Sequence, residues 1–295
     1  MRIPLTLLAA FATASLLAQT HALSAAEGPL IDQGRAALSR GDVDAAVDLF
    51  EKAVAQSPNS ATAHYYLGSA LGIKAQRSGM FSAAMLAGKT KEHFEKAVAL
   101  DPNYVDARFA LAEYYAIAPP FMGGDIDKAM AQAAEIKKRD SLQGHRAYAI
   151  IYSSQKKPEL TKKEYLDAIK EQPTSPKPHQ YLGQFLANTE KNYTAAFNEF
   201  ETALKLDATY MPALYLIGRT AANSGANFAR GEEALKKYLT TTPKEGEPAL
   251  ANAHYWLGMI YEKQNRKGEA RQQYETALKM NPSLQMATDA LKRVP

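Results

Sequence analysis

The sequence predicts an all-α fold in which about seven helical hairpins stack into a solenoid. Three observations support this prediction. The stretch 251–283 carries landmark residues at the spacing of two helices, similar landmarks recur at intervals of about 34 residues, and one such hairpin cannot cover its own apolar face. Neighbouring hairpins of the same kind would cover that face, so the chain is expected to fold as a stack.

The closing hairpin, residues 251–283, shows the pattern most completely. Its landmarks fall on one face of each expected helix: Leu257, Gly258, Tyr261, Ala270, Tyr274 and Ala277. Gly258 and Ala270 carry almost no side chain, so the two helix backbones can approach closely while the tyrosines fill the volume on either side. Pro282 stops the second helix.

The first repeat, residues 27–60, shows the same landmarks at the start of the expected mature chain. Gly34 lies in its first helix, and its second helix and stop carry the set Ala46, Phe50, Ala53 and Pro58. Gly41 and Asp42 mark the turn between the helices. Asp42 is expected to cap the second helix because its side chain can accept a hydrogen bond from a backbone N–H of the first turn.

The second and third repeats, 61–104 and 105–141, depart from the pattern by insertion. In the second, about ten extra residues within Gly72–Lys89 are expected in the turn between the two helices. In the third, a loop at 118–124 precedes a second helix that is expected to start at Asp125.

The later repeats return to the basic spacing and span 142–175, 176–210, 211–250 and 251–283. A further helix in the last segment, 284–295, is expected to cap the stack. The sixth repeat is longer than the others. Its second-helix landmarks are expected at Ala234 and Tyr238, with the extra residues in a turn between Asn223 and Gly231.

These hairpins resemble the tetratricopeptide repeat, whose signature of Leu-Gly, Tyr, Ala, Phe and Pro at fixed spacing is met almost completely by 251–283. The resemblance covers 27–295 and implies one right-handed superhelical solenoid. In the second and third repeats, the runs QRSGMFS, AGK, FEKAVALDP and APPFMGGD are also similar to a set of exported bacterial tetratricopeptide proteins. Arrays of this family serve many processes, so the resemblance indicates fold more sharply than function.

The first 26 residues have the composition of a secretory signal peptide. Arg2 gives a positive start, Leu5–Ala18 is an apolar run, and His21–Ala26 is rich in the small residues that precede a cleavage site. The apolar run is shorter than the ~20 residues needed to cross a bilayer, and no later stretch comes closer. We therefore expect cleavage near Ala26, export to the bacterial periplasm and a mature chain without a transmembrane segment.

Composition and charge exclude several classes of function. The 295 residues include no cysteine, which rules out disulfides, thiolate metal sites, cysteine nucleophiles and a lipid-modified N-terminal cysteine. Removal of the leader, whose only charged residue is Arg2, leaves 34 basic and 31 acidic side chains. This near balance, together with the lack of a basic run, argues against nucleic acid as a partner.

The sequence contains no recognisable catalytic motif: a glycine-rich phosphate loop, a G-x-S-x-G elbow and an H-E-x-x-H pair are all missing. Four histidines occupy the fourth position of their repeats, namely His64, His145, His179 and His254. Equivalent positions in packed helices lie about 8–10 Å apart or more, whereas zinc ligands lie about 2 Å from one ion. Packing between helices is therefore favoured over a zinc site, and no enzyme activity, cofactor or metal is expected.

The resemblance implies a concave groove that is lined by the first helices and faced by the fifth residue of each repeat. These fifth residues are Ile31, Tyr65, Phe109, Arg146, Gln180, Tyr215 and Tyr255. Arg35, Asn188, Arg219 and Asn223 fall at other positions that face the groove. Tyrosine and arginine suit peptide binding because they combine large rigid contact area with directional hydrogen bonds. Two interpretations stay open: the groove binds a partner, or its rings pack onto adjacent repeats.

Some members of this family clamp the C-terminal carboxylate of a partner with lysine and asparagine side chains on consecutive first helices. Here the fifth positions offer no lysine and the sixth positions offer no asparagine, the latter being Tyr66, Ala110, Ala147, Tyr181, Leu216 and Trp256. A receptor for such a clamped tail is therefore not expected.

The inserts of the second and third repeats give a second candidate surface. Because these repeats are neighbours, their turns are expected to meet at one edge and to gather the apolar side chains Met80, Phe81, Met85, Leu86, Pro119, Pro120, Phe121 and Met122. An exposed cluster would be a docking site, whereas a self-packed cluster would be a small local core. The sequence leaves both interpretations open.

These observations together predict a non-catalytic scaffold that binds a protein or peptide and acts as an adaptor or assembly factor in the bacterial cell envelope. The alternative is a structural subunit or homo-oligomer that docks through the inserts of the second and third repeats. No motif in the sequence identifies the partner.

Overall fold

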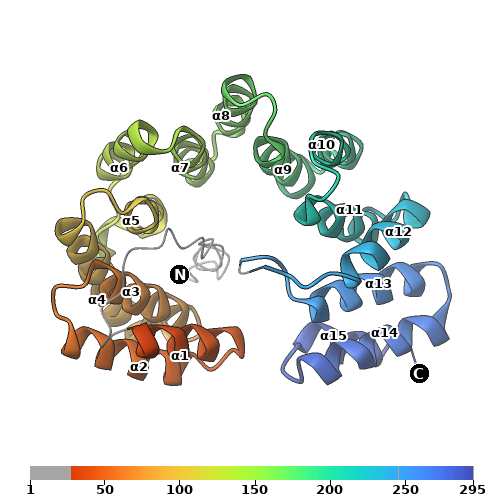
Figure 1. Ribbon diagram of the computed structural model, residues 1–295, viewed down its shortest axis with the longest axis horizontal. Helices are drawn as coiled ribbons and strands as arrows, with labels where there is room; N and C mark the ends of the chain where they lie inside the picture. Colours follow the sequence, from red (N-terminus) through yellow and green to blue (C-terminus); the bar gives the residue numbers. More distant parts are fainter. Residues whose placement is uncertain (1–27, 245, 295) are drawn as a thin grey trace. The chain divides into compact units, whose positions relative to one another are not determined.

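The computed structural model describes residues 28–244 and 246–294, so the expected signal peptide lies outside the described residues. Over this part of the chain the regular structure is entirely helical, with fifteen α-helices, one 3-10 turn and one π-helical turn (Figure 1). The prediction of an all-α fold built from helical hairpins is confirmed. No helix in this part of the chain is both long and apolar enough to serve as a membrane span.

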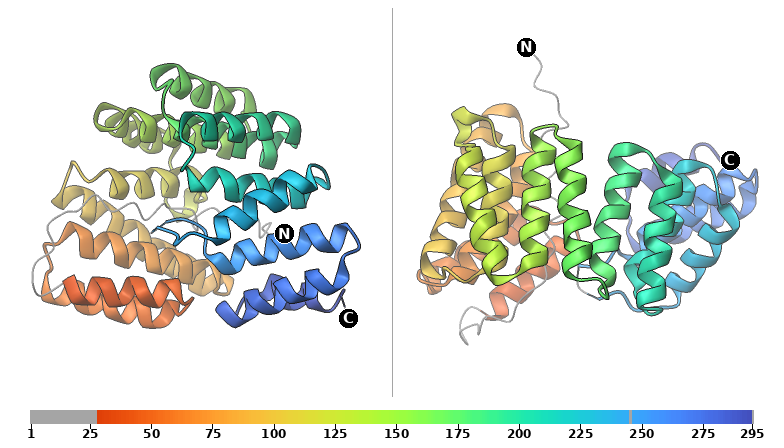
Figure 2. Two further views of the ribbon diagram at one scale, coloured as in Figure 1. Left: turned by 45° about the vertical axis from the view of Figure 1, so that its right-hand side comes forward. Right: turned by 90° about the horizontal axis from the view of Figure 1, so that it is seen from above.

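The chain divides into two compact units, one ending at Glu164 and the other starting at Tyr165. The helices of the first unit are α1 (Gly28–Ser39), α2 (Val43–Gln56), α3 (Ala61–Gln76), α4 (Met80–Leu100), α5 (Val105–Ile117), α6 (Ile126–Arg139) and α7 (Ser141–Ser154). The boundary between the units falls inside α8 (Pro158–Glu171). Within the first unit, consecutive helices pack side by side in antiparallel pairs (Figure 2).

The second unit continues with three hairpins and a closing helix. Its helices after α8 are α9 (Pro176–Phe185), α10 (Tyr193–Leu206), α11 (Met211–Ser224), α12 (Phe228–Leu239), α13 (Leu250–Lys263), α14 (Lys267–Met280) and α15 (Gln285–Leu291). A π-helical turn, Leu186–Glu190, follows α9. The short helix α15 packs on α13 and α14, where Ala287, Ala290 and Val294 are buried, so it covers the end of the last hairpin.

The extra residues of the second repeat lengthen its helices instead of its turn. α3 continues to Gln76 and α4 starts at Met80, so only Arg77–Gly79 lie between them. The expectation of an insert in the inter-helix turn was therefore wrong. The inserted segment contains four Ala and two Met within Gly72–Lys89, both residue types of high helix propensity, and α4 continues through it.

In the third repeat the extra residues do form a loop. This loop contains the 3-10 turn Pro120–Met122, and it ends where Asp125 caps α6, its Oδ1 accepting a hydrogen bond from the backbone N–H of Lys128 at 3.1 Å. Tyr114 of α5 holds the loop in place because its hydroxyl donates to the carbonyl of Met122 at 2.7 Å. The predicted start of the second helix at Asp125 is confirmed.

The extra residues of the sixth hairpin do not lie in the turn where the sequence analysis expects them. α11 ends at Ser224 and α12 starts at Phe228, so the turn between them is short. The extra residues lie after the hairpin, between the end of α12 at Leu239 and the start of α13 at Leu250. A helix-capping glycine, Gly225 with φ of 73°, ends α11 and makes the short turn possible.

The residues of the second helix of the sixth hairpin that contact the first helix also differ from those expected. The small residue there is Gly231, which lies against Ala221, and the large residue is Leu235, which fills the space beside Gly218. Both lie three residues before the expected landmarks Ala234 and Tyr238. The short turn is the physical reason, because it brings the second helix into contact sooner than a long turn would.

A close approach between the two helices organises the core of most hairpins. Gly68 of α3 faces Phe94 of α4 so closely that a Cβ atom on this glycine would lie 2.8 Å from the ring. A Cβ atom on Gly258 would lie 2.5 Å from the ring of Tyr274. The same relation joins Gly34 with Phe50, Gly183 with Phe200 and Gly218 with Leu235. Each glycine therefore makes room for one large side chain of the opposite helix.

A matched pair of glycines in the second hairpin tests this constraint. The substitution Gly68→Ala should destabilise the protein by about 1–3 kcal/mol, because the added methyl group overlaps the ring of Phe94. The substitution Gly88→Ala should stabilise it by about 0.5–1 kcal/mol, because Gly88 lies inside α4 and an added Cβ would meet nothing within 4 Å beyond its chain neighbours and the local helix backbone. Urea unfolding followed by circular dichroism measures both changes. Equal tolerance of the two substitutions would contradict the proposed packing constraint.

Candidate functional site

The aromatic side chains predicted to line the groove are buried. Tyr65 is 2% exposed, Phe109 6%, Tyr215 7% and Tyr255 8%. Ile31, which occupies the fifth position of the first repeat, is also fully buried. These side chains therefore serve packing between hairpins, and the expectation that they present an aromatic surface to a partner is corrected.

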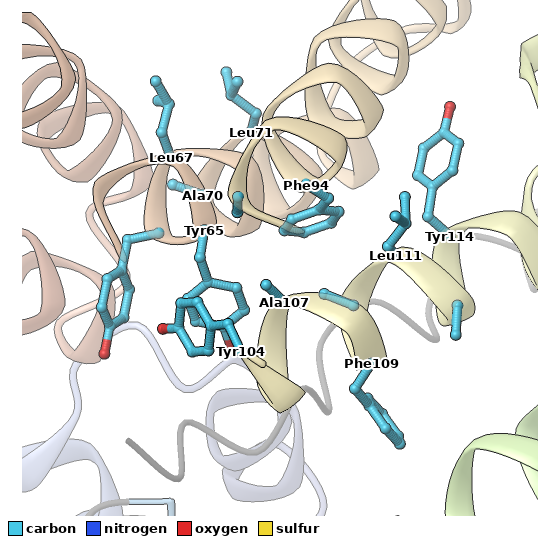
Figure 3. Packing of buried hydrophobic residues seen from close by; sticks show 14 of the residues in the cluster. Tyr65, Leu67, Ala70, Leu71, Phe94, Tyr104, Ala107, Phe109, Leu111 and Tyr114 are labelled. Atoms are coloured by element: carbon cyan, nitrogen blue, oxygen red, sulfur yellow. The ribbon is translucent and has the colours of Figure 1, made fainter. Parts of the chain in front are cut away.

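In the first unit, Tyr65 belongs to a cluster of rings between consecutive hairpins (Figure 3). Its ring centroid lies 5.2 Å from that of Tyr104 and 6.2 Å from that of Phe94. Phe109 points away from Tyr65 and Tyr104, and its ring is covered by the guanidinium of Arg146, with 4.5 Å between the guanidinium carbon and the ring centroid. This cation–π contact joins α5 to α7 and engages Arg146, another residue predicted to line the groove.

In the second unit, the rings at the fifth positions are held by both packing and hydrogen bonds. Tyr215 lies 5.5 Å from Tyr238 between ring centroids, and its hydroxyl accepts a hydrogen bond from Trp256 Nε1 at 2.8 Å. Tyr255 lies 4.8 Å from Trp256, its own neighbour in α13. Gln180 accepts a hydrogen bond from the hydroxyl of Tyr210. The second interpretation left open by the sequence, packing onto adjacent repeats, is therefore the one that these contacts support.

Some of the apolar residues predicted as a docking cluster are exposed, and others are buried in the core. Met80, Phe81, Met85 and Phe121 are 66%, 86%, 62% and 78% exposed, respectively. Leu86 is buried in the core of the first unit, and Met122 packs partly against that core. The exposed residues Met80, Phe81 and Met85 lie on the first two turns of α4 instead of in a loop. This part of the surface is therefore apolar, but smaller than the sequence indicated.

The four histidines at the fourth position of their repeats each contact the second helix of their own hairpin. His64 pairs with His93, His145 with Glu164, His179 with Glu199 and His254 with Gln273, through Nδ1 at 2.7–2.8 Å. In the third repeat the same position holds Arg108, whose Nη1 donates to Gln132 at 2.7 Å. A polar bond between paired helices is thus a recurring part of the hairpin. Among the described residues, no group of three or more His, Cys, Asp or Glu is placed to hold a metal ion.

Two acidic side chains of α5 have perturbed pKa values, and no sequence motif marks either of them. Burial raises the pKa of Asp106 to about 7, and Arg146 acts in the opposite direction. Burial likewise raises the pKa of Glu113 to about 7, again opposed by Arg146. Both lie on the same helix as Phe109, so this part of the first unit combines acidic groups with the arginine that covers the ring.

A polar pocket of about 270 Å³ lies in the second unit, where the π-helical turn after α9 meets α10 and α11. Its lining residues are Ala187, Asn188, Lys191, Tyr193, Arg219, Thr220 and Asn223. Three of them, Asn188, Arg219 and Asn223, were predicted to face the groove. The structure brings these three together in one pocket.

The local chain geometry explains how the pocket forms. The π-helical turn widens the end of the first helix, and Lys191 then adopts a left-handed conformation with φ of 55°. Asn192 closes this turn, because its N–H donates to the carbonyl of Leu186 at 2.9 Å and its side chain caps α10. Asn188 therefore lies beside α11, where it accepts a hydrogen bond from Arg219 Nη2 at 2.7 Å.

The pocket has the chemistry of an anion receptor. Its described lining includes two cationic side chains, Lys191 and Arg219, and none that is acidic. Because the oxygen of Asn188 is used by Arg219, its amide nitrogen is left to donate. At the rim, Lys263 of α13 reaches the backbone carbonyl of Asn223, with 3.4 Å between Nζ and the oxygen. Such a set of donors suits a carboxylate or another oxyanion.

Two segments of the chain match family models of the tetratricopeptide repeat, at residues 251–284 and 31–71. No curated protein sequence matches the chain. The match at 251–284 covers the closing hairpin, and the match at 31–71 runs from within α1 through α2 into α3.

Several solved structures have a similar fold. A tetratricopeptide repeat protein from Parabacteroides merdae is 14% identical, with a TM-score of 0.52 over 91% of this chain and 98% of that chain. The human IFIT1 dimer with PPP-AAAA is 20% identical, with a TM-score of 0.55 over 90% and 62%. A chain of the APC/C hetero-tetramer Cut9-Hcn1 is 17% identical, with a TM-score of 0.51 over 94% and 50%, so this chain spans about half its length. At these identities the likeness shows the fold alone.

The pair formed by His64 and His93 predicts a dependence of stability on pH. Burial and the neighbouring His64 lower the pKa of His93, so the unfolded chain binds a proton more readily as the pH falls below about 6.5. The free energy of unfolding should therefore decrease as the pH is lowered through that value, and His93→Gln should remove part of the decrease. Urea unfolding at a series of pH values measures both. An identical pH dependence in the wild type and the variant would refute this role for His93.

Proposed function

Because the chain is a tetratricopeptide-repeat protein, we propose that it is a non-catalytic scaffold that binds a protein or peptide partner and acts as an adaptor or assembly factor in the bacterial cell envelope. Repeat solenoids of this kind are built for protein interaction, because consecutive hairpins present one extended surface. The expected signal peptide in the first 26 residues supports the envelope as the place of action.

The observation that carries this proposal is a polar row on consecutive hairpins of the second unit. Asn188, Asn223 and Lys263 each occupy the thirteenth position of their repeats, near the end of a first helix. Arg219 donates a hydrogen bond to Asn188, and Lys263 contacts the backbone carbonyl of Asn223. The row has hydrogen-bonding groups at a surface that the packing of the hairpins does not cover, which is what a partner-binding surface requires.

The structure changes which residues should be altered to test partner binding. The aromatic fifth positions, such as Tyr65 and Tyr215, are poor choices because their truncation would leave cavities between hairpins. Exposed members of the polar row are better choices. Asn223 is an exposed residue of the pocket lining. Asn198 of α10 is also exposed but lies outside the lining, so it serves as a matched control.

Site-specific photo-cross-linking in intact cells tests the scaffold proposal. A photo-reactive amino acid at position 223 should give a discrete cross-linked product, and the same amino acid at position 198 should not. The product should be recovered in the fraction released by osmotic shock, with the leader removed. Products that are identical at the two positions, or the same partner recovered only from the cytoplasm, would refute the proposal. Mass spectrometry of the product identifies the partner.

A second candidate function, a homo-oligomer that docks through the start of α4, is favoured by the exposure of Met80, Phe81 and Met85. Three large apolar side chains on two adjacent helical turns are costly in contact with water. A second copy of the chain could cover them with the same surface, as two-fold symmetric dimers do.

Light scattering after gel filtration tests this second candidate. The wild type should have the mass of a dimer or a larger assembly, and Phe81→Asp should shift it to a monomer. Met280→Asp is the control, because Met280 is also exposed, at 53%, but lies in α14 of the second unit. A wild type that is strictly monomeric at all concentrations tested would remove this candidate.

A further inference from the structure

The pocket between the π-helical turn and α11 is a local feature of the second unit. Arg219 occupies the ninth position of its repeat, and Asn188 and Asn223 occupy the thirteenth. In the second and third repeats the thirteenth positions hold Ile73 and Ile117. The hairpin fold therefore accepts apolar side chains at this position, and packing alone does not account for the polar residues of the second unit.

The charged groups around the pocket are nearly all of one sign. Lys191 and Arg219 line it, and Lys263 lies at its rim. Glu190 precedes Lys191 in the chain but is not part of the lining, and Glu262 is engaged elsewhere by Arg293 and the hydroxyl of Tyr274. The described lining residues include no carboxylate, so the three cations repel one another. An anion placed between them would relieve that repulsion.

The polar groups of the pocket are donors that an anion could use. Arg219 uses Nη2 for its bond to Asn188, and the structure gives no protein acceptor, among the described residues, for its other guanidinium nitrogens. The amide nitrogens of Asn188 and Asn223 and the hydroxyl groups of Tyr193 and Thr220 add further donors. A guanidinium pairs with a carboxylate through parallel N–H···O bonds, which gives direction as well as strength.

We infer that this pocket binds acidic side chains of the partner, so that the second unit recognises a segment containing Asp or Glu. The inference rests on the proposed scaffold function and names the chemistry of its partner. The cations come from three consecutive repeats, with Lys191 in the fifth, Arg219 in the sixth and Lys263 in the seventh. An extended segment with several carboxylates matches such a row better than one compact anion does.

Fluorescence polarisation with labelled peptides tests this inference on the full-length protein. The probe is a short oligoglutamate with an amidated C-terminus, and oligoglutamine of the same length is the neutral control. The wild type should bind oligoglutamate and not oligoglutamine, with an affinity that falls as salt is added. Equal binding of the two peptides would overturn the inference, as would binding of inorganic phosphate at the pocket without binding of oligoglutamate.

Matched variants place the binding at the pocket. The double substitution Lys191→Gln with Arg219→Gln should weaken oligoglutamate binding at least about tenfold, because it removes two charge-assisted contacts. Asn223→Asp should also weaken it, since it places a carboxylate in the pocket four residues after Arg219, where it can compete with the peptide for the guanidinium. Arg35→Gln is the control, because Arg35 occupies the same ninth position in the first repeat and pairs with Asp32 at 3.4 Å.

Unchanged binding in both pocket variants, or an equal loss in Arg35→Gln, would overturn the inference. Thermal unfolding of each variant checks that its fold is retained, and Asn223→Asp keeps the test valid if the double variant is unstable. The outcome is separable from that of the scaffold proposal. If the double variant captures the cross-linked partner as well as the wild type does, only the inference about the pocket is overturned. If oligoglutamate binds but no cross-linked partner is found, only the scaffold proposal is contradicted.

Discussion

The close approach of the two helices in a hairpin is the constraint on which the rest of the structure depends. A glycine of the first helix, such as Gly68 or Gly258, lets a ring of the second helix occupy the space that the Cβ atom of any other residue would fill. This contact fixes the rotation of the first helix as well as its distance. The fourth residue of the repeat then faces the partner helix, the fifth faces the adjacent hairpin, and the ninth and thirteenth fall toward the polar pocket in the second unit.

The sequence predicts this constraint well because it depends on residue size at fixed spacing. Gly34 with Phe50 and Gly258 with Tyr274 can be recognised as pairs of small and large residues from their spacing alone. The sequence predicts the extra residues poorly, because an insertion changes spacing without revealing where the helix stops. The segment after Gly79 has high helix propensity and extends α4, whereas Gly231, which looks like a turn residue, is the small landmark of its helix.

The candidate site was harder to predict for a different reason. A ring at the fifth position can either face a groove or fill the space between hairpins. The position of the residue in the helix is the same in both cases, so the sequence pattern does not distinguish them. Tyr65 and Tyr215 are buried through contacts with Tyr104 and with Trp256, residues whose approach depends on tertiary packing. The polar residues Asn188, Arg219 and Asn223 were found because their phase was right. Lys191 was missed because it lies in a turn whose π-helical geometry has no simple sequence signal.

The pocket also illustrates how function separates from fold in a repeated structure. A position that the packing requires holds similar residues in every hairpin, as the small residues Gly34, Ala112 and Gly183 do at the eighth position. A position that packing leaves open is free to differ, and the thirteenth position changes from Ile117 in the first unit to Asn223 in the second. The cations Lys191, Arg219 and Lys263, which lie at or beside the pocket, repel one another, so the fold by itself gives no reason to keep them. An anionic group of a partner would explain why the cations are kept. When bound, it neutralises their mutual repulsion and so stabilises the complex relative to the free protein.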